Sequence, residues 1–249
     1  MKQIYLPSVG STNAWMQENL MHQTWDEGTL VYTDYQTNGR GQLTNTWESE
    51  AGKNILMSMY FAPLWLPIKD QFVLSQAVAL GVVDFLRQYA DGFQIKWPND
   101  IYWQHQKIAG ILIEQNLVGG SIASSIVGIG LNINQNVFLS DAPNPVSLYQ
   151  IIGKELPLQE VLQQLQKSLV KRYQQAKSQP TNIQADYASV LYLNGQWAYY
   201  KDDNGEFEGR ILYVEPRGYL HIEDKDQVVR KYAFKEVQFL LDKNLQDSI

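Results

Sequence analysis

Two segments near the middle of the chain combine ammonium, carboxylate and amide side chains at close spacing. The first reads Lys96-Trp97-Pro98-Asn99-Asp100, and the second reads Lys107-Ile108-Ala109-Gly110-Ile111-Leu112-Ile113-Glu114. The proline ends a strand, residues 99 and 100 form a turn, and the next hairpin returns with Lys107 at its start. Lys96, Asp100 and Lys107 then lie near one sheet surface, where two cations and a carboxylate suit a nucleotide with its magnesium ion. The alternative is an edge hairpin with solvated lysines.

A polar segment before them, residues 39–52, contains three glycines and one arginine. Glycines let backbone N–H groups approach a ligand closely, and Arg40 can donate two hydrogen bonds to a phosphate or a carboxylate. The segment is not a P-loop, because the earlier glycine is missing and Asn54 replaces the Ser or Thr. A surface loop with a solvated arginine is the alternative interpretation.

Two further segments present small polar groups. In Gly128-Ile129-Gly130-Leu131-Asn132-Ile133-Asn134, glycines and asparagines alternate with apolar residues, so one face of a strand is small and polar. Asn132 and Asn134 could bind a ligand or satisfy nearby backbone groups. Ser11-Thr12-Asn13, together with Gln36, could hold a polar ring or a carboxylate, although Ser11 and Thr12 also fit a plain helix N-cap. Gly110 inside an apolar strand indicates close packing against the backbone.

Hydrophobic spacing predicts the elements that position these residues. Apolar residues at helical spacing predict a helix over residues 70–90, which ends at Asp91-Gly92. Another helix begins at Pro157, and a short one covers residues 183–193. Strands are expected over residues 31–35, 55–61, 94–98, 101–103, 107–114 and 122–134, and their short connections favour antiparallel neighbours.

After residue 195 the pattern changes to short strands separated by turns. Strands are expected over residues 196–201, 206–215, 219–223 and 228–234, with turns at residues 203–205 and 217–218. Short strands of this kind predict a small β-barrel. The expected domains are residues 1–190, which carry the candidate site, and residues 191–249.

Composition narrows the functional classes. The 249 residues are 45% hydrophobic and 18% charged, so a packed core is expected. The net charge of −6 argues against a general nucleic-acid binder. The sequence has no cysteine for disulfides or thiolate metal sites, and its three histidines form no ligand-spaced pair. With neither a signal peptide nor a run of about 20 apolar residues, the cytoplasm is the expected location.

Taken together and in this order, the four segments resemble the biotin–protein ligase family, in its short form without an N-terminal DNA-binding domain. The resemblance covers the sequence through residue 135, and the last residues resemble that family's SH3-like barrel. It implies an α+β fold with a mixed, largely antiparallel sheet flanked by helices, similar to class II aminoacyl-tRNA synthetases. A small C-terminal SH3-like β-barrel would follow at residues 191–249.

The activity that the resemblance implies is a two-step ligation. Biotin and MgATP first form biotinyl-5′-adenylate and pyrophosphate. Biotin then passes to one lysine of the biotin carboxyl carrier protein domain of a biotin-dependent carboxylase. ATP and Mg²⁺ are thus the expected cofactors, biotin is the substrate, and no metal-ligating residue is assigned.

The resemblance also implies site residues. Lys107 and Arg40 would be catalytic, with Lys107 between the biotin carboxylate and the α-phosphate. Biotin would be held by Ser11, Thr12, Asn13, Gln36, Gly39, Arg40, Gly41, Lys107 and Gly110. The nucleotide would be held by Gln42, Trp47, Lys96, Asn99, Asp100 and Asn132.

The sequence departs from the family pattern in the glycine loop. Many members carry an arginine at the position of Gln42, and a glycine and often another arginine where Thr44 and Asn45 stand. Arg40 is therefore expected to carry the phosphate role. In the barrel, Lys235 could reach the nucleotide or be a solvated charge, and the second interpretation is favoured.

Partners and rival functions follow from the same motifs. Because Ser11 already belongs to the biotin motif, no DNA-binding domain and no DNA partner are expected, nor is a membrane partner. The oligomeric state, monomer or homodimer, is left open. The alternatives are a lipoate or octanoyl protein ligase of the related fold, or a non-catalytic module that binds biotin and nucleotide.

Overall fold

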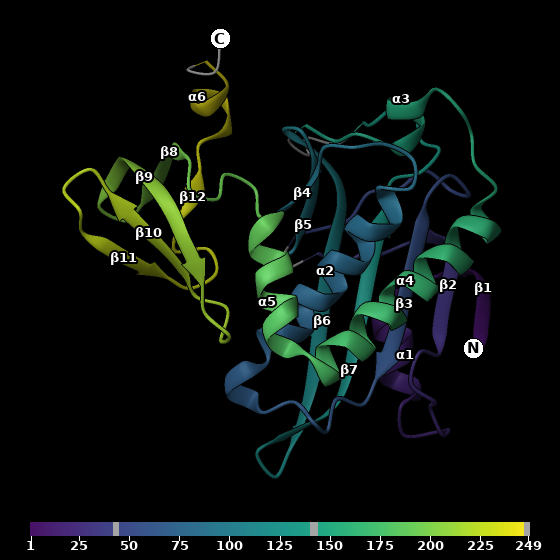
Figure 1. Ribbon diagram of the computed structural model, residues 1–249. Helices are drawn as coiled ribbons and strands as arrows, with labels where there is room; N and C mark the ends of the chain where they lie inside the picture. Colours follow the sequence, from purple (N-terminus) through teal and green to yellow (C-terminus); the bar gives the residue numbers. More distant parts are fainter. Residues whose placement is uncertain (42–44, 140–143, 247–249) are drawn as a thin grey trace.

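The structure is a computed structural model that describes residues 1–41, 45–139 and 144–246. Figure 1 shows a large sheet with helices on its faces and a smaller all-β part beside it. The large sheet has seven strands in the order β1-β2-β3-β7-β6-β5-β4. They are β1 (Gln3–Val9), β2 (Leu30–Gln36), β3 (Ile55–Phe61), β4 (Phe93–Lys96), β5 (Asp100–Trp103), β6 (Gln106–Val118) and β7 (Ser121–Leu131).

Strand pairing confirms the α+β class with a mixed, largely antiparallel sheet. The pair β1 and β2 is parallel, and the other neighbours in this sheet are antiparallel. The sequence pattern did not predict β1, which is an edge strand whose half-exposed residues lack a clear alternation. Pro7 is compatible with that place, because an edge strand leaves one row of N–H groups unpaired. In the β6–β7 hairpin, β6 continues to Val118, beyond the expected residue 114, whereas β7 ends at Leu131, so Asn132 and Asn134 follow the strand instead of lying on it.

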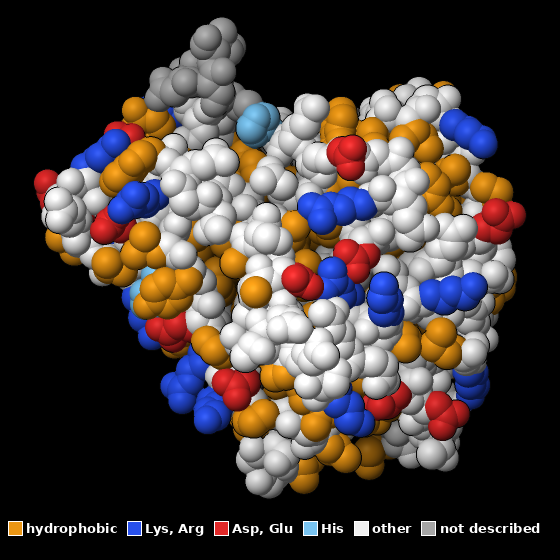
Figure 2. All heavy atoms as spheres, in the orientation of Figure 1, with side chains coloured by type: hydrophobic (Ala, Val, Ile, Leu, Met, Phe, Trp, Pro, Cys, Tyr) orange, Lys and Arg blue, Asp and Glu red, His pale blue; other side chains and the backbone are white. Residues whose placement is uncertain are grey.

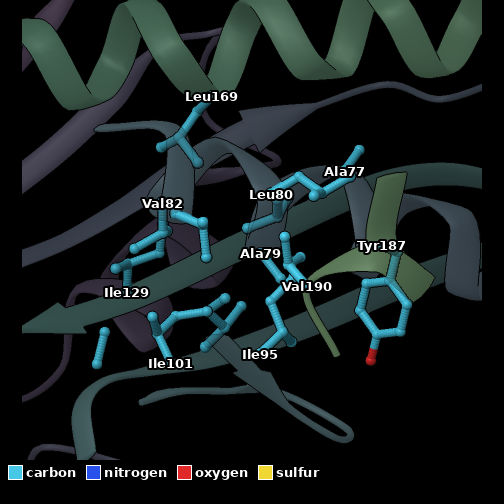
Figure 3. Close-up of a cluster of buried hydrophobic side chains, with 14 of the residues drawn as sticks. Ala77, Ala79, Leu80, Val82, Ile95, Ile101, Ile129, Leu169, Tyr187 and Val190 are labelled. Carbon is cyan, nitrogen blue, oxygen red and sulfur yellow. The ribbon is translucent and has the colours of Figure 1, made fainter. Parts of the chain in front are cut away.

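The alternation of side chains along the central strands separates a core face from a site face. Met57 and Met59 on β3, with Ile129 and Leu131 on β7, belong to the main buried cluster. Figure 3 shows part of this cluster beneath α4, including residues of β4, β5 and β7. The residues between them point to the other side of the sheet, which is the side that carries the candidate site.

Three helices cover the core face: α2 (Phe72–Leu86), α4 (Leu158–Ser178) and α5 (Pro180–Ser189). α2 packs closely on α4, since a Cβ at Gly81 would lie 3.0 Å from Leu169 Cα. Arg172 of α4 joins the three helices through ion pairs with Asp84 and Asp186 at 2.6 and 2.5 Å. The predicted helices are confirmed, with α2 shorter and α5 earlier than expected because Pro180 begins α5.

On the opposite face, α1 (Thr12–Asn19) buries Met16 against Val31 and Ile126. Its first turn therefore rests on the site face of β3 and β7. The remaining helices are short. They are η1 (Ile68–Asp70), α3 (Leu148–Ile152) and α6 (Leu241–Gln246).

The C-terminal part is a five-stranded antiparallel sheet in the order β11-β10-β9-β8-β12. Its strands are β8 (Trp197–Asp202), β9 (Gly205–Val214), β10 (Leu220–Asp224), β11 (Val229–Tyr232) and β12 (Gln238–Phe239). The four predicted strands are present, and the two-residue β12 is additional. Residues 190 and 192 still hydrogen-bond to Ile95 of β4, so the domain boundary at residue 190 stays a prediction.

Figure 2 shows one face of the molecule, on which acidic and basic side chains are interspersed over both parts. Within the described residues, no helix is both long and apolar enough to cross a membrane.

Candidate active site

A cavity of about 1300 Å³ opens on the site face of the large sheet. Its walls come from the start of α1, the loop around Trp47, the residues between β4 and β5, and the hairpin β6–β7. Residues 234–241 of the C-terminal part close one end. The described site residues named from the sequence motifs line this cavity, except Gly39, which lies beside it in the same loop.

The α1 end of the cavity carries a buried polar cluster. Ser11 is the N-cap of α1 and accepts a hydrogen bond from the Ala14 backbone N–H at 3.5 Å. The N–H of Thr12 donates to Gln36 Oε1 at 2.9 Å. Ser58 of β3, fully buried, lies 2.7 Å from Thr12 Oγ1 and 2.5 Å from Asn13 Oδ1. The helix N-cap and the polar pocket that were predicted from Ser11, Thr12 and Asn13 are therefore not alternatives, because the same residues form both.

Glycines on β6 and β7 make room for this cluster and for the loop. Gly110 and Gly130 are cross-strand partners. A Cβ at Gly128 would lie 2.4 Å from Asn13 Oδ1, and one at Gly130 would lie 2.3 Å from Trp47 Cε2. At Gly110 the distance to Trp47 would be 3.0 Å. The close packing predicted at Gly110 is confirmed, and the group that packs there is the Trp47 indole.

Lys107 stands at the middle of the cavity. Its ammonium forms a 2.7 Å ion pair with Asp100 and lies 5.7 Å from the centre of the Trp47 ring. Its backbone is held by the segment around Pro145, because its N–H donates to Asn144 O and its carbonyl accepts from Val146 N. The ion pair brings together the two charges that the motif predicted on one surface.

Lys96 lies deeper, at the junction with the C-terminal part. Its Nζ is 5.3 Å from the centre of the Tyr102 ring and 4.9 Å from that of Phe239 in β12. Burial lowers the pKa of the Lys96 ammonium below its ordinary value of 10.5; Asp100 opposes this effect and Lys107 adds to it. A cation held by rings in place of carboxylates retains its attraction for an incoming anion.

The asparagines divide between ligand-facing and structural roles. Asn132 donates through Nδ2 to Val146 O at 3.0 Å, while its buried Oδ1 has no partner among the described residues. Asn134 instead bridges Leu156, accepting from its N–H and donating to its carbonyl. Asn99 donates to Ile111 O at 2.6 Å and so ties the turn to β6. Asn132 therefore has a buried acceptor left for a ligand.

The glycine loop folds onto itself and onto β6. Gly39 and Gly41 lie against the backbone of Trp47 and Asn45, where a Cβ would clash with the carbonyl of Trp47 or crowd that of Asn45. Arg40 Nη2 lies 2.8 Å from both carboxylate oxygens of Glu114. Gln42 and Thr44 lie outside the described residues.

The sequence motifs did not point to Ser58 or to Glu114. They also did not point to the residues of the C-terminal part that line the cavity. Ser58 lies within an apolar strand, so its role depends on which face it occupies, and that face is set by the pairing of β3 with β7. Lys235 lines the cavity and is exposed, so a contact with the nucleotide and a solvated charge both stay predictions. Its backbone has φ of 69°, in the left-handed region that disfavours side chains with a Cβ. No group of three or more potential metal-binding His, Asp or Glu side chains occurs among the described residues.

Comparisons with known proteins agree with this geometry. A model of the biotin/lipoate A/B protein ligase family matches residues 5–132. The bifunctional ligase/repressor BirA of Bacillus subtilis is 32% identical over 238 residues, covering 92% of this chain and 72% of that protein. The biotin–[acetyl-CoA-carboxylase] ligase of Mycobacterium tuberculosis is 28% identical over 184 residues, covering 72% of this chain and 66% of that protein.

The fold has the same relatives. Biotin protein ligase from Aquifex aeolicus, solved in complex with biotin and ATP, matches with a TM-score of 0.79 and 25% identity. The match covers 95% of this chain and 97% of that one, so it includes the C-terminal part. The resemblance inferred from the motifs is confirmed, and the chain belongs to the biotin/lipoate A/B protein ligase family.

Proposed function

We propose that the chain is a biotin–protein ligase, which forms biotinyl-5′-AMP and transfers biotin to a lysine of a biotin carboxyl carrier protein domain. The observation that carries this proposal is the layout of one cavity. A buried polar cluster on α1 and β3 lies at one end, a nucleotide-sized space with a free buried acceptor lies at the other, and Lys107 lies between them. The similar Aquifex enzyme was solved with biotin and ATP.

The first step joins two anions. An oxygen of the biotin carboxylate attacks the α-phosphorus of ATP, a carboxylate–phosphorus bond forms, and the bond to the β-phosphate oxygen breaks to release pyrophosphate. Lys107 stabilises the charge that accumulates between carboxylate and α-phosphate, and Asp100 fixes its position through the 2.7 Å ion pair. Mg²⁺ enters as part of the substrate MgATP.

Binding of each substrate relies on different chemistry. The ureido ring of biotin needs both donors and acceptors inside an apolar pocket, and Ser11, Thr12, Asn13 and Gln36 supply them. On the nucleotide side, Asn132 Oδ1 accepts from an N–H such as the exocyclic amine of adenine. Lys96 is expected to bind the phosphates, Arg40 is expected to reach them from its place beside Glu114, and Trp47 is expected to cover the adenylate.

The second step is attack by the ε-amine of the carrier lysine on the biotinyl carbonyl. A carbon–nitrogen bond forms, and the anhydride bond to AMP breaks. The adenylate must be kept from water until the carrier arrives, which is the role of the loop containing Arg40 and Trp47. No covalent enzyme intermediate is required.

The rival acid is lipoate or octanoate, because the matching family includes lipoate ligases. Exchange of pyrophosphate into ATP separates the candidates. We expect exchange to depend on biotin; exchange with lipoate but not with biotin would favour the rival. Binding of biotin and ATP without formation of AMP would support the non-catalytic module.

The test of the proposal is transfer of labelled biotin to a carrier domain by the wild type and by Lys107→Ala. The variant should lose transfer by about 10²–10³-fold, since one preorganised charge at a transition state is worth that much. Lys53→Ala is the matched control, because Lys53 forms an exposed ion pair with Glu155 instead. Equal activity of wild type and Lys107→Ala would contradict the assigned role.

The remaining partner assignments are expectations. A carboxylase carrier domain is the expected protein substrate, and the enzyme is expected to act in the cytoplasm without DNA. Whether it works as monomer or homodimer is a matter for sedimentation measurements.

A further inference from the structure

Glu114 lies beside the cavity and contacts two residues that line it, Arg40 and Asn13. It is on the site face of β6, and its side chain is 37% exposed. Three contacts converge on its carboxylate. Arg40 Nη2 lies 2.8 Å from each oxygen, and Asn13 Nδ2 donates to Oε2 at 2.7 Å. Glu114 therefore connects the loop that carries Arg40 to the polar cluster on α1.

From Asn13 a hydrogen-bond chain continues into the pocket. Asn13 Oδ1 lies 2.5 Å from Ser58 Oγ, which lies 2.7 Å from Thr12 Oγ1. Thr12 in turn lies next to Gln36 Oε1, at 2.9 Å from its backbone nitrogen and 3.2 Å from its hydroxyl. Thr12, Asn13 and Ser58 are each at most 3% exposed, so water does not compete for the contacts among these three residues.

The carboxylate sets the direction of this chain. Glu114 and the Leu112 carbonyl, 3.3 Å from Asn13 Nδ2, only accept hydrogen bonds, so the amide nitrogen of Asn13 must face them. Asn13 Oδ1 then faces Ser58 and can only accept, so the single Ser58 proton goes to it. The 2.7 Å contact between Ser58 and Thr12 then takes the Thr12 proton, which leaves the longer 3.2 Å contact between Thr12 Oγ1 and Gln36 Oε1 without one.

This direction fixes what the pocket offers a ligand. Because the Thr12 proton is used toward Ser58, Thr12 Oγ1 can act toward a ligand only as an acceptor, through its lone pairs. Gln36 Oε1 faces the Thr12 N–H, so the carboxamide nitrogen of Gln36 is the end that remains as a donor. A cyclic urea has N–H donors and a carbonyl acceptor and matches this arrangement. If the hydrogen bonds ran in the opposite direction, Ser58 would donate to Thr12 and the Thr12 proton would point away from Ser58. The pocket would then no longer match a cyclic urea.

We propose that Glu114 is a positioning residue for recognition of the acid substrate. As the acceptor-only end of the chain, it orients Asn13, and through Ser58 it sets the direction of the Thr12 hydroxyl proton, beside the Gln36 carboxamide that the Thr12 backbone N–H orients. This inference rests on the proposed function, because the ligand is taken to be biotin. It assigns Glu114 no contact with the reacting atoms.

The test is biotin binding without ATP, measured by calorimetry at neutral pH. Glu114→Gln keeps the shape but leaves the Asn13 amide held in this orientation by the longer 3.3 Å contact with the Leu112 carbonyl. A flipped amide then costs less, so the dissociation constant for biotin should rise about tenfold. Asn13→Asp places two carboxylates in contact and should weaken binding by about 100-fold. In the double variant Asn13→Asp/Glu114→Gln, the new carboxylate at position 13 accepts from Ser58, and the new carboxamide at position 114 donates to that carboxylate. Binding should then return to within about fivefold of wild type.

The recovery in the double variant isolates the proposed route. Arg40 has lost its carboxylate partner in Glu114→Gln and in the double variant alike, so an effect through Arg40 would persist in both. Glu155→Gln is the matched control, because it removes an exposed carboxylate from an ion pair with Lys53, and its affinity should be unchanged. Circular dichroism identifies any variant that fails to fold. If the double variant does not fold, the comparison of biotin affinity between Glu114→Gln and wild type decides.

The outcomes are distinct. Unchanged affinity in Glu114→Gln, or no recovery in a folded double variant, would overturn the positioning role while leaving the ligase assignment intact. If the wild type itself bound no biotin, both the proposed function and this inference would fail. A rise in the KM for biotin with an unchanged KM for ATP in Glu114→Gln would support it further.

Discussion

Lys96 and Lys107 carry the same charge in different surroundings. Lys107 is neutralised by Asp100 at 2.7 Å, whereas Lys96 lies between the rings of Tyr102 and Phe239. Burial lowers the pKa of Lys96 from its ordinary 10.5. An anion that binds beside Lys96 favours its charged form. At a pH where Lys96 of the free enzyme has lost its proton, ATP binding should therefore be accompanied by the uptake of one proton.

The affinity for ATP should therefore decrease as the pH rises through the lowered pKa of Lys96. The dissociation constant should increase by at most about tenfold per pH unit for one linked proton. Lys96→Arg stays charged over this range and should show a flatter profile. The measurement is calorimetric titration with a non-hydrolysable ATP analogue from neutral to alkaline pH. The same slope in both proteins would show that Lys96 is not the group responsible.

At this scale the motifs predicted many of the side chains that line the cavity, but not Ser58 and Glu114, which contact lining residues from behind. Both lie within apolar strands, where a polar side chain gives no signal of the face it occupies. Their role depends on register, since Ser58 pairs with Gly128, and Gly128 pairs with Leu112. Only the assembled sheet brings Asn13 into contact with all three strands.

At the scale of elements, glycines on the site face of β6 and β7 leave space for side chains from the loop and from α1. Gly130 receives the Trp47 indole, and Gly128 receives the Asn13 amide. The alternation of glycine with apolar residues is visible in the sequence and predicts one small face. Which groups fill that face is decided by the loop and by α1, which are distant in sequence.

Gly130→Ala should displace Trp47, because the new Cβ would stand 2.3 Å from the indole. A shift of about 1 Å in a covering group should lower kcat/KM for adenylate formation by about 10–100-fold. Gly10→Ala, whose Cβ would meet nothing within 4 Å, should be close to wild type. Pyrophosphate exchange measures both. Full activity of Gly130→Ala would mean that Trp47 does not need this position.

At the scale of the whole molecule, the C-terminal part completes the cavity. Trp97 donates from Nε1 to Gly218 O at 2.9 Å, and its ring meets Phe234 edge-on at 6.4 Å. Gly218 also packs on Phe72, where a Cβ would lie 2.9 Å away. The specific Trp-Pro motif therefore contributes to the junction between the two parts as well as to the site.

Trp97→Phe removes the hydrogen bond to Gly218 and should destabilise the protein by about 1 kcal/mol. Because the barrel closes the nucleotide end, the KM for ATP should rise while the affinity for biotin stays the same. Trp103→Phe is the control, since its indole donates to Asp91 O within the same part at 3.0 Å. Thermal melting and steady-state kinetics measure these effects. An equal rise in the KM for ATP in both variants would contradict the bridging role.

Local patterns in the chain were sufficient to predict most strands, the main helices, the barrel, the family and most of the residues around the cavity. Alternation and helical periodicity specify which side of an element is buried, so these features can be read from spacing. The folded molecule was needed to learn that Arg40 pairs with Glu114, that Ser58 connects Thr12 to Asn13, and that the barrel reaches Lys96. These contacts join residues far apart in the chain, so they depend on strand register and on the docking of the two parts, which no local pattern records.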